Sequence, residues 1–134
     1  RRFRALKLWF VIRAYGVCGL QTIIRNHVMW AGALAKRIGA TPEFELTSPP
    51  RLGLFSFRLR PHGYVDGEAL DRLNARFLDA VNADGTIYLT QTVHDGRYVI
   101  RVSIGATATE AKDIDIAYDT IRRLAVPFMA DAAE

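Results

Sequence analysis

One arginine stands in the middle of an otherwise apolar stretch of this chain. Arg101 lies between Ile100 and Val102 in the stretch Tyr98-Val99-Ile100-Arg101-Val102-Ser103-Ile104, which is otherwise largely apolar. A guanidinium stays charged at working pH, so a place among such residues is costly unless the side chain has an anionic partner. Its planar fork suits a carboxylate or a phosphate. The partner is either an acidic side chain of this chain or a ligand, and Arg101 is therefore the first candidate binding residue.

The surroundings of Arg101 leave both alternatives open. Residues 97–104 read as one strand, in which alternation places Arg101 on the same face as Val99 and Ser103. The even-numbered residues of this strand face the other way. With no likeness to other proteins considered, an internal salt bridge or an exposed sheet face explains Arg101 as well as a ligand does.

Other patterns that carry chemistry are missing from the sequence. It has no CxxC or HExxH, and its three histidines lie far apart, so a metal site has little support. It also lacks the glycine-rich phosphate loops and the GxSxG nucleophile elbow. The lysines at positions 7, 36 and 112 are expected on helices, where none resembles a buried lysine that bonds a carbonyl. By its own residues the chain has no recognisable catalytic apparatus.

Composition bounds the class of protein. The chain has 134 residues, half of them apolar and 24% charged, which fits one globular domain. Its single cysteine, Cys18, excludes an internal disulfide and fits a reducing compartment, so we expect a cytoplasmic protein with Cys18 as an inert core thiol. The apolar stretch Leu6–Leu20 is interrupted by Lys7, Arg13 and Gly16, which makes it too charged for a membrane span.

The net charge of +4 is concentrated near the start, which reads Arg1-Arg2-Phe3-Arg4. Cations are unfavourable at a helix N-terminus, so these arginines suggest acidic groups nearby. The charge permits nucleic-acid binding without arguing strongly for it. Because the chain opens without a methionine, we expect it to be a piece of something longer.

Two helices are expected at the start of the chain. Residues 3–15 are apolar nearly all round, which calls for burial on several sides and hints at a missing partner surface. Gly16 and Gly19 are expected to end or bend this helix. Residues 20–38 are amphipathic, with Gly39 as the C-cap and with His27 packed or half-exposed beside the apolar stripe.

The rest of the chain reads as a mixture of strands and helices. Strands are expected near Phe44 and over residues 52–59, 86–92 and 97–104, the last two joined by an Asp95-Gly96 hairpin. One helix is expected between Asp66 as N-cap and Gly85 as C-cap, and another after a capping box at residues 107–110. The order predicts an α+β fold, a small mainly antiparallel sheet with helices on one face.

Several runs of the sequence resemble one enzyme family. They are Arg1–Arg13 with Tyr15-Gly16-Val17 and Gly19-Leu20-Gln21, then Leu52-Gly53-Leu54, Phe57-Arg58-Leu59, Ile87-Tyr88-Leu89-Thr90 and Tyr98-Val99-Ile100-Arg101. They are similar to the C-terminal portion of the group II pyridoxal-phosphate decarboxylases, in particular the aromatic-L-amino-acid, tyrosine and histidine decarboxylases. The likeness covers almost the whole chain.

The resemblance implies the C-terminal small domain of a fold-type-I pyridoxal-phosphate enzyme. Residues 1–38 would be linking and interface helices, and residues 39–134 the small α+β domain. The large domain, outside this chain, would bind the pyridoxal 5'-phosphate and carry the lysine that bonds it. The partners expected are the rest of the decarboxylase chain, a second copy in a homodimer and the amino-acid substrate, with neither nucleic acid nor membrane among them.

The resemblance also implies a role for Arg101. It aligns with a small-domain arginine that, in the glutamate branch of the family, looks towards the substrate α-carboxylate. The implied function is that of part of an L-amino-acid decarboxylase, acting on aromatic substrates and releasing CO2 to give the amine. The chain alone would not be catalytic. A tight grip on the carboxylate does not help the bond-breaking step, so Arg101 is expected to position the substrate.

Two other readings start from the same residues. A small basic α+β module could stack RNA bases on sheet-face aromatics, for which Phe55, Phe57, Tyr88 and Tyr98 are the candidates. An interaction domain that has lost catalysis is the third reading.

Overall fold

Three helices and four strands make up the fold, which the computed structural model of the chain describes over residues 3–130. The helices are α1 (Arg4–Gly39), α2 (Glu68–Asp84) and α3 (Ala111–Ala130), and the strands are β1 (Phe44–Arg51), β2 (Leu54–Leu59), β3 (Thr90–His94) and β4 (Arg97–Ser103). The strands form one antiparallel sheet in the order β1-β2-β4-β3. This arrangement confirms the predicted α+β class.

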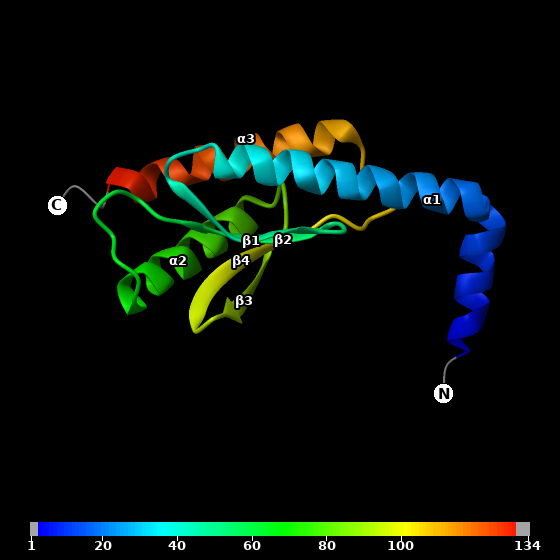
Figure 1. Cartoon of the computed structure of the whole chain (residues 1–134), viewed down its shortest axis with the longest axis horizontal. Helices are drawn as coiled ribbons and strands as arrows, with labels where there is room; N and C mark the ends of the chain where they lie inside the picture. The colour runs from blue at the N-terminus through cyan, green and yellow to red at the C-terminus, as the bar shows by residue number, and fades with distance from the viewer. Residues whose placement is uncertain (1–2, 131–134) are drawn as a thin grey trace.

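Helix α1 consists of two straight parts that meet at Gly16. The backbone of Gly16 has φ 66° and ψ 169°, a conformation that essentially only glycine adopts. The part before it turns away from the body of the molecule (Figure 1). The sequence placed the break at Gly16 or Gly19, and the structure puts it at Gly16. The expected N-terminal arginine cluster includes Arg1 and Arg2, which lie outside the described residues.

The projecting first part of α1 leaves its large apolar side chains in solvent. They are Phe3, Leu6, Leu8, Trp9, Phe10, Val11, Ile12 and Tyr15. Cys18, just past the kink, is exposed as well, so the prediction of a core thiol is wrong for this chain. The reason is geometric, because the buried residues of α1 begin only at His27. Within residues 3–130 no helix combines the length and the low charge that crossing a bilayer would need.

The core lies between the helices and one face of the sheet. The second part of α1 contributes Ala31, Leu34, Ala35 and Ile38 at helical spacing, and it runs alongside α3 above the sheet (Figure 1). The sheet contributes Phe44, Phe55, Phe57, Leu59, Ile100 and Val102, and α2 contributes Leu70, Leu73, Phe77 and Val81. Burial of each large side chain contributes about 1.5–3 kcal/mol, so this layer holds the strands in place.

His27 is a buried polar residue of α1. Its side chain is buried, and its Nε2 lies 3.1 Å from the carbonyl oxygen of Ala106 in the segment that follows β4. The structure therefore confirms the prediction of a packed histidine.

Two element boundaries differ from the sequence prediction. Helix α2 begins at Glu68 after Gly67, and Asp66 does not cap it, because the Asp66 carboxylate pairs with Arg58. The strand expected from residue 86 starts only at Thr90. In place of a neighbouring strand, Asn82 of α2 accepts from the N–H of Leu89 and donates to its carbonyl oxygen.

The start of α3 is also later than predicted. The expected capping box at residues 107–110 would open the helix at residue 108, whereas α3 begins at Ala111. The N–H of Glu110 donates to Asp113 Oδ2 at 2.8 Å, so the cap lies three residues further on. At the other end of the fold, Gly85 adopts the left-handed conformation expected of a C-cap after α2.

Candidate functional site

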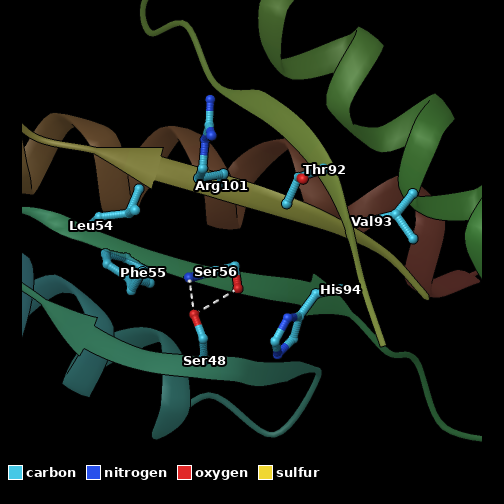
Figure 2. A pocket seen from close by; sticks show the side chains of 8 residues that line it. All are labelled: Ser48, Leu54, Phe55, Ser56, Thr92, Val93, His94 and Arg101. Atoms are coloured by element: carbon cyan, nitrogen blue, oxygen red, sulfur yellow. Dashed lines mark hydrogen bonds between the residues drawn. The ribbon is translucent and has the colours of Figure 1, made fainter. Parts of the chain in front are cut away.

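Four polar side chains lie in register across the strands of the sheet. Ser48 of β1 pairs with Ser56 of β2, Ser56 with Arg101 of β4, and Arg101 with Thr90 of β3. Because side chains alternate along a strand, this row lies on the face opposite Phe57, Ile100 and the helices. Most of the row lines a hollow of about 300 Å³, together with Leu54, Phe55, Thr92, Val93 and His94 (Figure 2).

Arg101 lies at the rim of this hollow. Its side chain is exposed, and its Nε donates to Thr90 Oγ1 at 3.1 Å. Within residues 3–130 no carboxylate pairs with it, and its two terminal nitrogens have no hydrogen-bond partner. Figure 2 shows the guanidinium extending away from Ser48 and Ser56. Those terminal nitrogens can therefore donate two parallel hydrogen bonds to a carboxylate, the bidentate geometry typical of arginine.

This geometry corrects the argument that singled out Arg101. The sequence placed it among apolar residues, where burial would demand an anionic partner, but its side chain is exposed. On the same face Val99 and Arg58 are buried, and on the other face Ile100 and Val102 are buried against the helices. Of the two partners considered, an internal acid is not found among the described residues. An external anion stays a prediction.

A cluster of hydroxyl groups forms the opposite wall of the hollow. Ser56 Oγ lies 2.8 Å from both Thr47 Oγ1 and Ser48 Oγ, and the N–H of Ser56 donates to Ser48 Oγ at 3.1 Å. The register of β1 shifts between Leu46 and Ser48, which brings both hydroxyls to Ser56. These groups satisfy one another, and no histidine within residues 3–130 bonds to them. The wall is therefore polar and neutral, without an activated nucleophile.

Arg58 is a buried arginine of the sheet, and the sequence predicted no role for it. Its side chain is 0% exposed, and its Nη1 and Nη2 donate to Asp66 Oδ1 at 3.0 Å and to Asp71 Oδ1 at 2.6 Å. Its Nε has no hydrogen-bond partner among the described residues. The two acids lie 8 and 13 residues further along, and only the fold shows that they cover it.

The lysines of this chain do not fit covalent attachment of an aldehyde cofactor. Lys7, Lys36 and Lys112 are exposed. Lys112 Nζ lies 2.6 Å from Glu110 Oε2, and this hydrogen bond and charge raise the pKa of Lys112. A raised pKa disfavours the neutral amine that attacks a carbonyl. No group of three potential metal ligands forms within residues 3–130 either.

The aromatic residues considered for RNA stacking do not form a platform. Phe55 and Phe57 are buried in the core beneath the helices. Tyr98 is partly buried against the same core, and Tyr88 is exposed but precedes β3. The open face presents hydroxyls and Arg101 where stacked bases would need aromatic rings. The stacking surface offered for the RNA reading is therefore wrong.

Comparison with known proteins gives this geometry a context. Residues 1–60 match the model of the pyridoxal-dependent decarboxylase conserved domain. A tryptophan decarboxylase of Camptotheca acuminata is 39% identical over 122 residues, which are 91% of this chain and 24% of that protein. The chain thus spans about a quarter of the length of the curated relatives it matches.

Two solved structures share the fold closely. The Oryza sativa tryptophan decarboxylase solved with pyridoxal phosphate and tryptamine has a TM-score of 0.85 at 32% identity, over 96% of this chain and 28% of its own. The 4-hydroxyphenylacetaldehyde synthase of Rhodiola rosea has a TM-score of 0.82 at 32% identity, over 95% and 27%. By sequence and by fold, this chain is similar to one part, about a quarter, of proteins of the pyridoxal-dependent decarboxylase family.

Proposed function

We propose that this chain is part of an L-amino-acid decarboxylase acting on aromatic substrates, releasing CO2 and forming the amine. The relatives that support this substrate class include tryptophan and tyrosine decarboxylases at 38–39% identity. The observation that carries the proposal is Arg101, an arginine without an acidic partner among residues 3–130, at the rim of a hollow. Such a cation is available to an amino acid's carboxylate, the group that this reaction removes.

In this proposal Arg101 binds and orients the substrate. Its terminal nitrogens would hold the α-carboxylate, while Thr90 fixes the guanidinium through the hydrogen bond to Nε. Holding the carboxylate fixes the orientation of the bond between Cα and the carboxylate carbon, which is the bond that breaks. The interaction with the carboxylate is as strong in the bound substrate as in the transition state, so we expect Arg101 to act mainly on substrate binding.

The remaining parts of the active site would come from outside this chain. Pyridoxal phosphate supplies the electron-accepting chemistry in this family, and the lysines described here are unsuited to hold it, so we assign it to the large domain. Residues 1–38 would link residues 39–134 to that domain. The exposed apolar start of α1 would be covered by the large domain and by a second copy in a homodimer.

We also propose that the enzyme is cytoplasmic. The free, exposed thiol of Cys18 supports a reducing location. Fluorescence of the tagged complete protein in its own cell tests this, and signal confined to an organelle or the cell surface would overturn it.

The activity is tested on the complete enzyme that contains this chain. Purified with pyridoxal phosphate, it is given L-tryptophan and L-tyrosine, with L-glutamate as the non-aromatic comparison. We expect one CO2 for each amine formed from the aromatic substrates, and no turnover by the 134-residue chain alone. Aldehyde and ammonia in place of the amine would show the oxidative reaction instead, and no CO2 from any of these amino acids would contradict the proposal.

A further inference from the structure

The hydrogen-bond ladder between β2 and β4 stops before either strand ends. Its last registered pair is Phe57 with Ile100, although β2 continues to Leu59 and β4 begins at Arg97. By the antiparallel register the next residues to exchange backbone bonds would be Leu59 and Tyr98. On the same two strands Ser56 lies opposite Arg101. The groups that bond the backbone of Leu59 and Tyr98 therefore also help to fix the strand that carries Arg101.

Two side chains of α2 fill the gap. Asn74 Oδ1 accepts from the N–H of Leu59 at 2.8 Å, and Asn74 Nδ2 donates to the carbonyl oxygen of Leu59 at 2.9 Å. Asp71 Oδ1 accepts from the N–H of Tyr98 at 3.1 Å. The helix thus completes both strands where they no longer reach each other.

The Asp71 carboxylate also receives the buried arginine. Its Oδ1 accepts from Arg58 Nη2 at 2.6 Å as well as from the Tyr98 N–H. A continuous connection therefore runs from Arg58 on β2, through Asp71, to Tyr98 on β4. Arg101 follows Tyr98 by three residues, or about 10 Å along a strand.

The two arginines share one face of the sheet. Arg58 follows Ser56 by two residues, and Ser56 lies opposite Arg101. Asp66 and Asp71 both pair with Arg58, whereas no described carboxylate pairs with Arg101. Arg58 therefore engages both of these acids, and the terminal nitrogens of Arg101 have no partner among the described residues.

We propose that Asp71, paired with Arg58, is a positioning residue for Arg101: it fixes β4 against β2 so that the guanidinium meets the substrate carboxylate at the correct angle. The proposal rests on the function proposed above. It assigns a role in substrate binding to two residues that do not line the hollow.

The test uses the complete enzyme with pyridoxal phosphate bound. For Asp71→Ala we expect KM for the aromatic amino acid to rise about tenfold while kcat changes less than about twofold. Asp71→Asn keeps an acceptor for Tyr98 and should recover most of the binding. Glu68→Ala is the matched control, because Glu68 is an acid of the same helix turn whose one ion pair within residues 3–130 is with exposed Arg72, and it should leave KM unchanged.

A double variant identifies the route of the effect. With Arg101→Ala already present, Asp71→Ala should raise KM no further, because the side chain that it positions is gone. An additive rise, or wild-type KM in Asp71→Ala, would overturn the inference. Should Asp71→Ala fail to fold, Arg58→Lys decides: it must raise KM by a measurable factor that disappears in the Arg101→Ala background.

These results separate the two proposals. A raised KM in Arg101→Ala with wild-type KM in every Asp71 and Arg58 variant would remove the positioning role only. Wild-type kinetics in Arg101→Ala would remove the carboxylate-binding function, and the positioning role would fall with it.

Discussion

Arg58 and Asp71 form an ion pair in which only the acid reaches solvent. Arg58 Nη2 lies 2.6 Å from Asp71 Oδ1, and the arginine side chain is 0% exposed whereas that of the aspartate is 33% exposed. The same oxygen accepts the backbone N–H of Tyr98. One carboxylate thus joins β2, β4 and α2, and its loss and the loss of its partner should have unequal consequences.

Removing Asp71 should destabilise the chain more than removing Arg58. Asp71→Ala leaves a buried cation with Asp66 as its sole described acid, which costs about 3–5 kcal/mol. Arg58→Met leaves two carboxylates that water reaches, and we expect a loss of about 1–2 kcal/mol. Urea unfolding of dilute chain measures both. The larger loss in Arg58→Met would show that solvent access does not decide the order.

Asn74 tests whether α2 supports the ends of the strands. It is fully buried and bonds both backbone groups of Leu59 and the carbonyl oxygen of Leu70. Asn74→Leu keeps the approximate volume but leaves these groups unpaired, so unfolding should become about 2–4 kcal/mol easier. Asn82→Leu is the comparison for which we expect a smaller loss, because the part-buried amide of Asn82 bonds only the backbone of Leu89 among the described residues. Equal losses would argue against a special role for Asn74.

The sequence predicted elements wherever the signal is local. Gly85 ends α2 because its left-handed conformation suits glycine, and the Asp95-Gly96 turn joins β3 to β4. Each of these features depends on residues that are close neighbours in the chain.

Features that depend on distant partners could not be predicted in this way. An arginine in an apolar strand was expected to have an anionic partner. The arginine that is buried with such partners is Arg58, and its two acids lie in the loop before α2 and in the first turn of α2. Arg101 is exposed although Val99, on the same side of β4, is buried, and alternation along the strand does not reveal this difference. Asp66 reads as an N-cap until the fold brings it to Arg58, a competition that sequence spacing does not reveal.

Asp84 should make the free energy of unfolding depend on pH. The hydroxyl of Thr86 donates to it and the Arg123 guanidinium pairs with it, and together they hold its pKa below the ordinary 3.8. The folded state therefore favours the charged acid, and this contribution is complete above the ordinary pKa and is lost as pH falls through the lowered value.

The measurement compares the wild-type chain with Asp84→Asn. The gap between their urea midpoints should be constant near neutral pH and should shrink below about pH 4. Arg123→Met should reduce the gap only in part, because the Thr86 bond remains. A gap of the same size at every pH would contradict the lowered pKa.

Cys18 reports whether the start of α1 is covered in the complete enzyme. In this chain it is exposed, next to the exposed Val17. If the large domain and a second copy cover residues 1–38, labelling of Cys18 by a soluble thiol reagent should be at least about tenfold slower in the complete enzyme than in the free chain. Peptide mass spectrometry separates Cys18 from other cysteines. Equal labelling rates would contradict a covered first helix.

The central claim is that Arg101 binds the carboxylate of the substrate, and its most direct test compares a ligand that has this group with one that lacks it. In the complete enzyme, Arg101→Ala should lower kcat/KM about tenfold to a hundredfold, because a charged hydrogen bond is lost. The inhibition constant of the product amine, which has no carboxylate, should stay unchanged, and Arg123→Ala should leave both values at wild type. Wild-type kcat/KM in Arg101→Ala, or equal weakening of substrate and amine, would contradict the assignment.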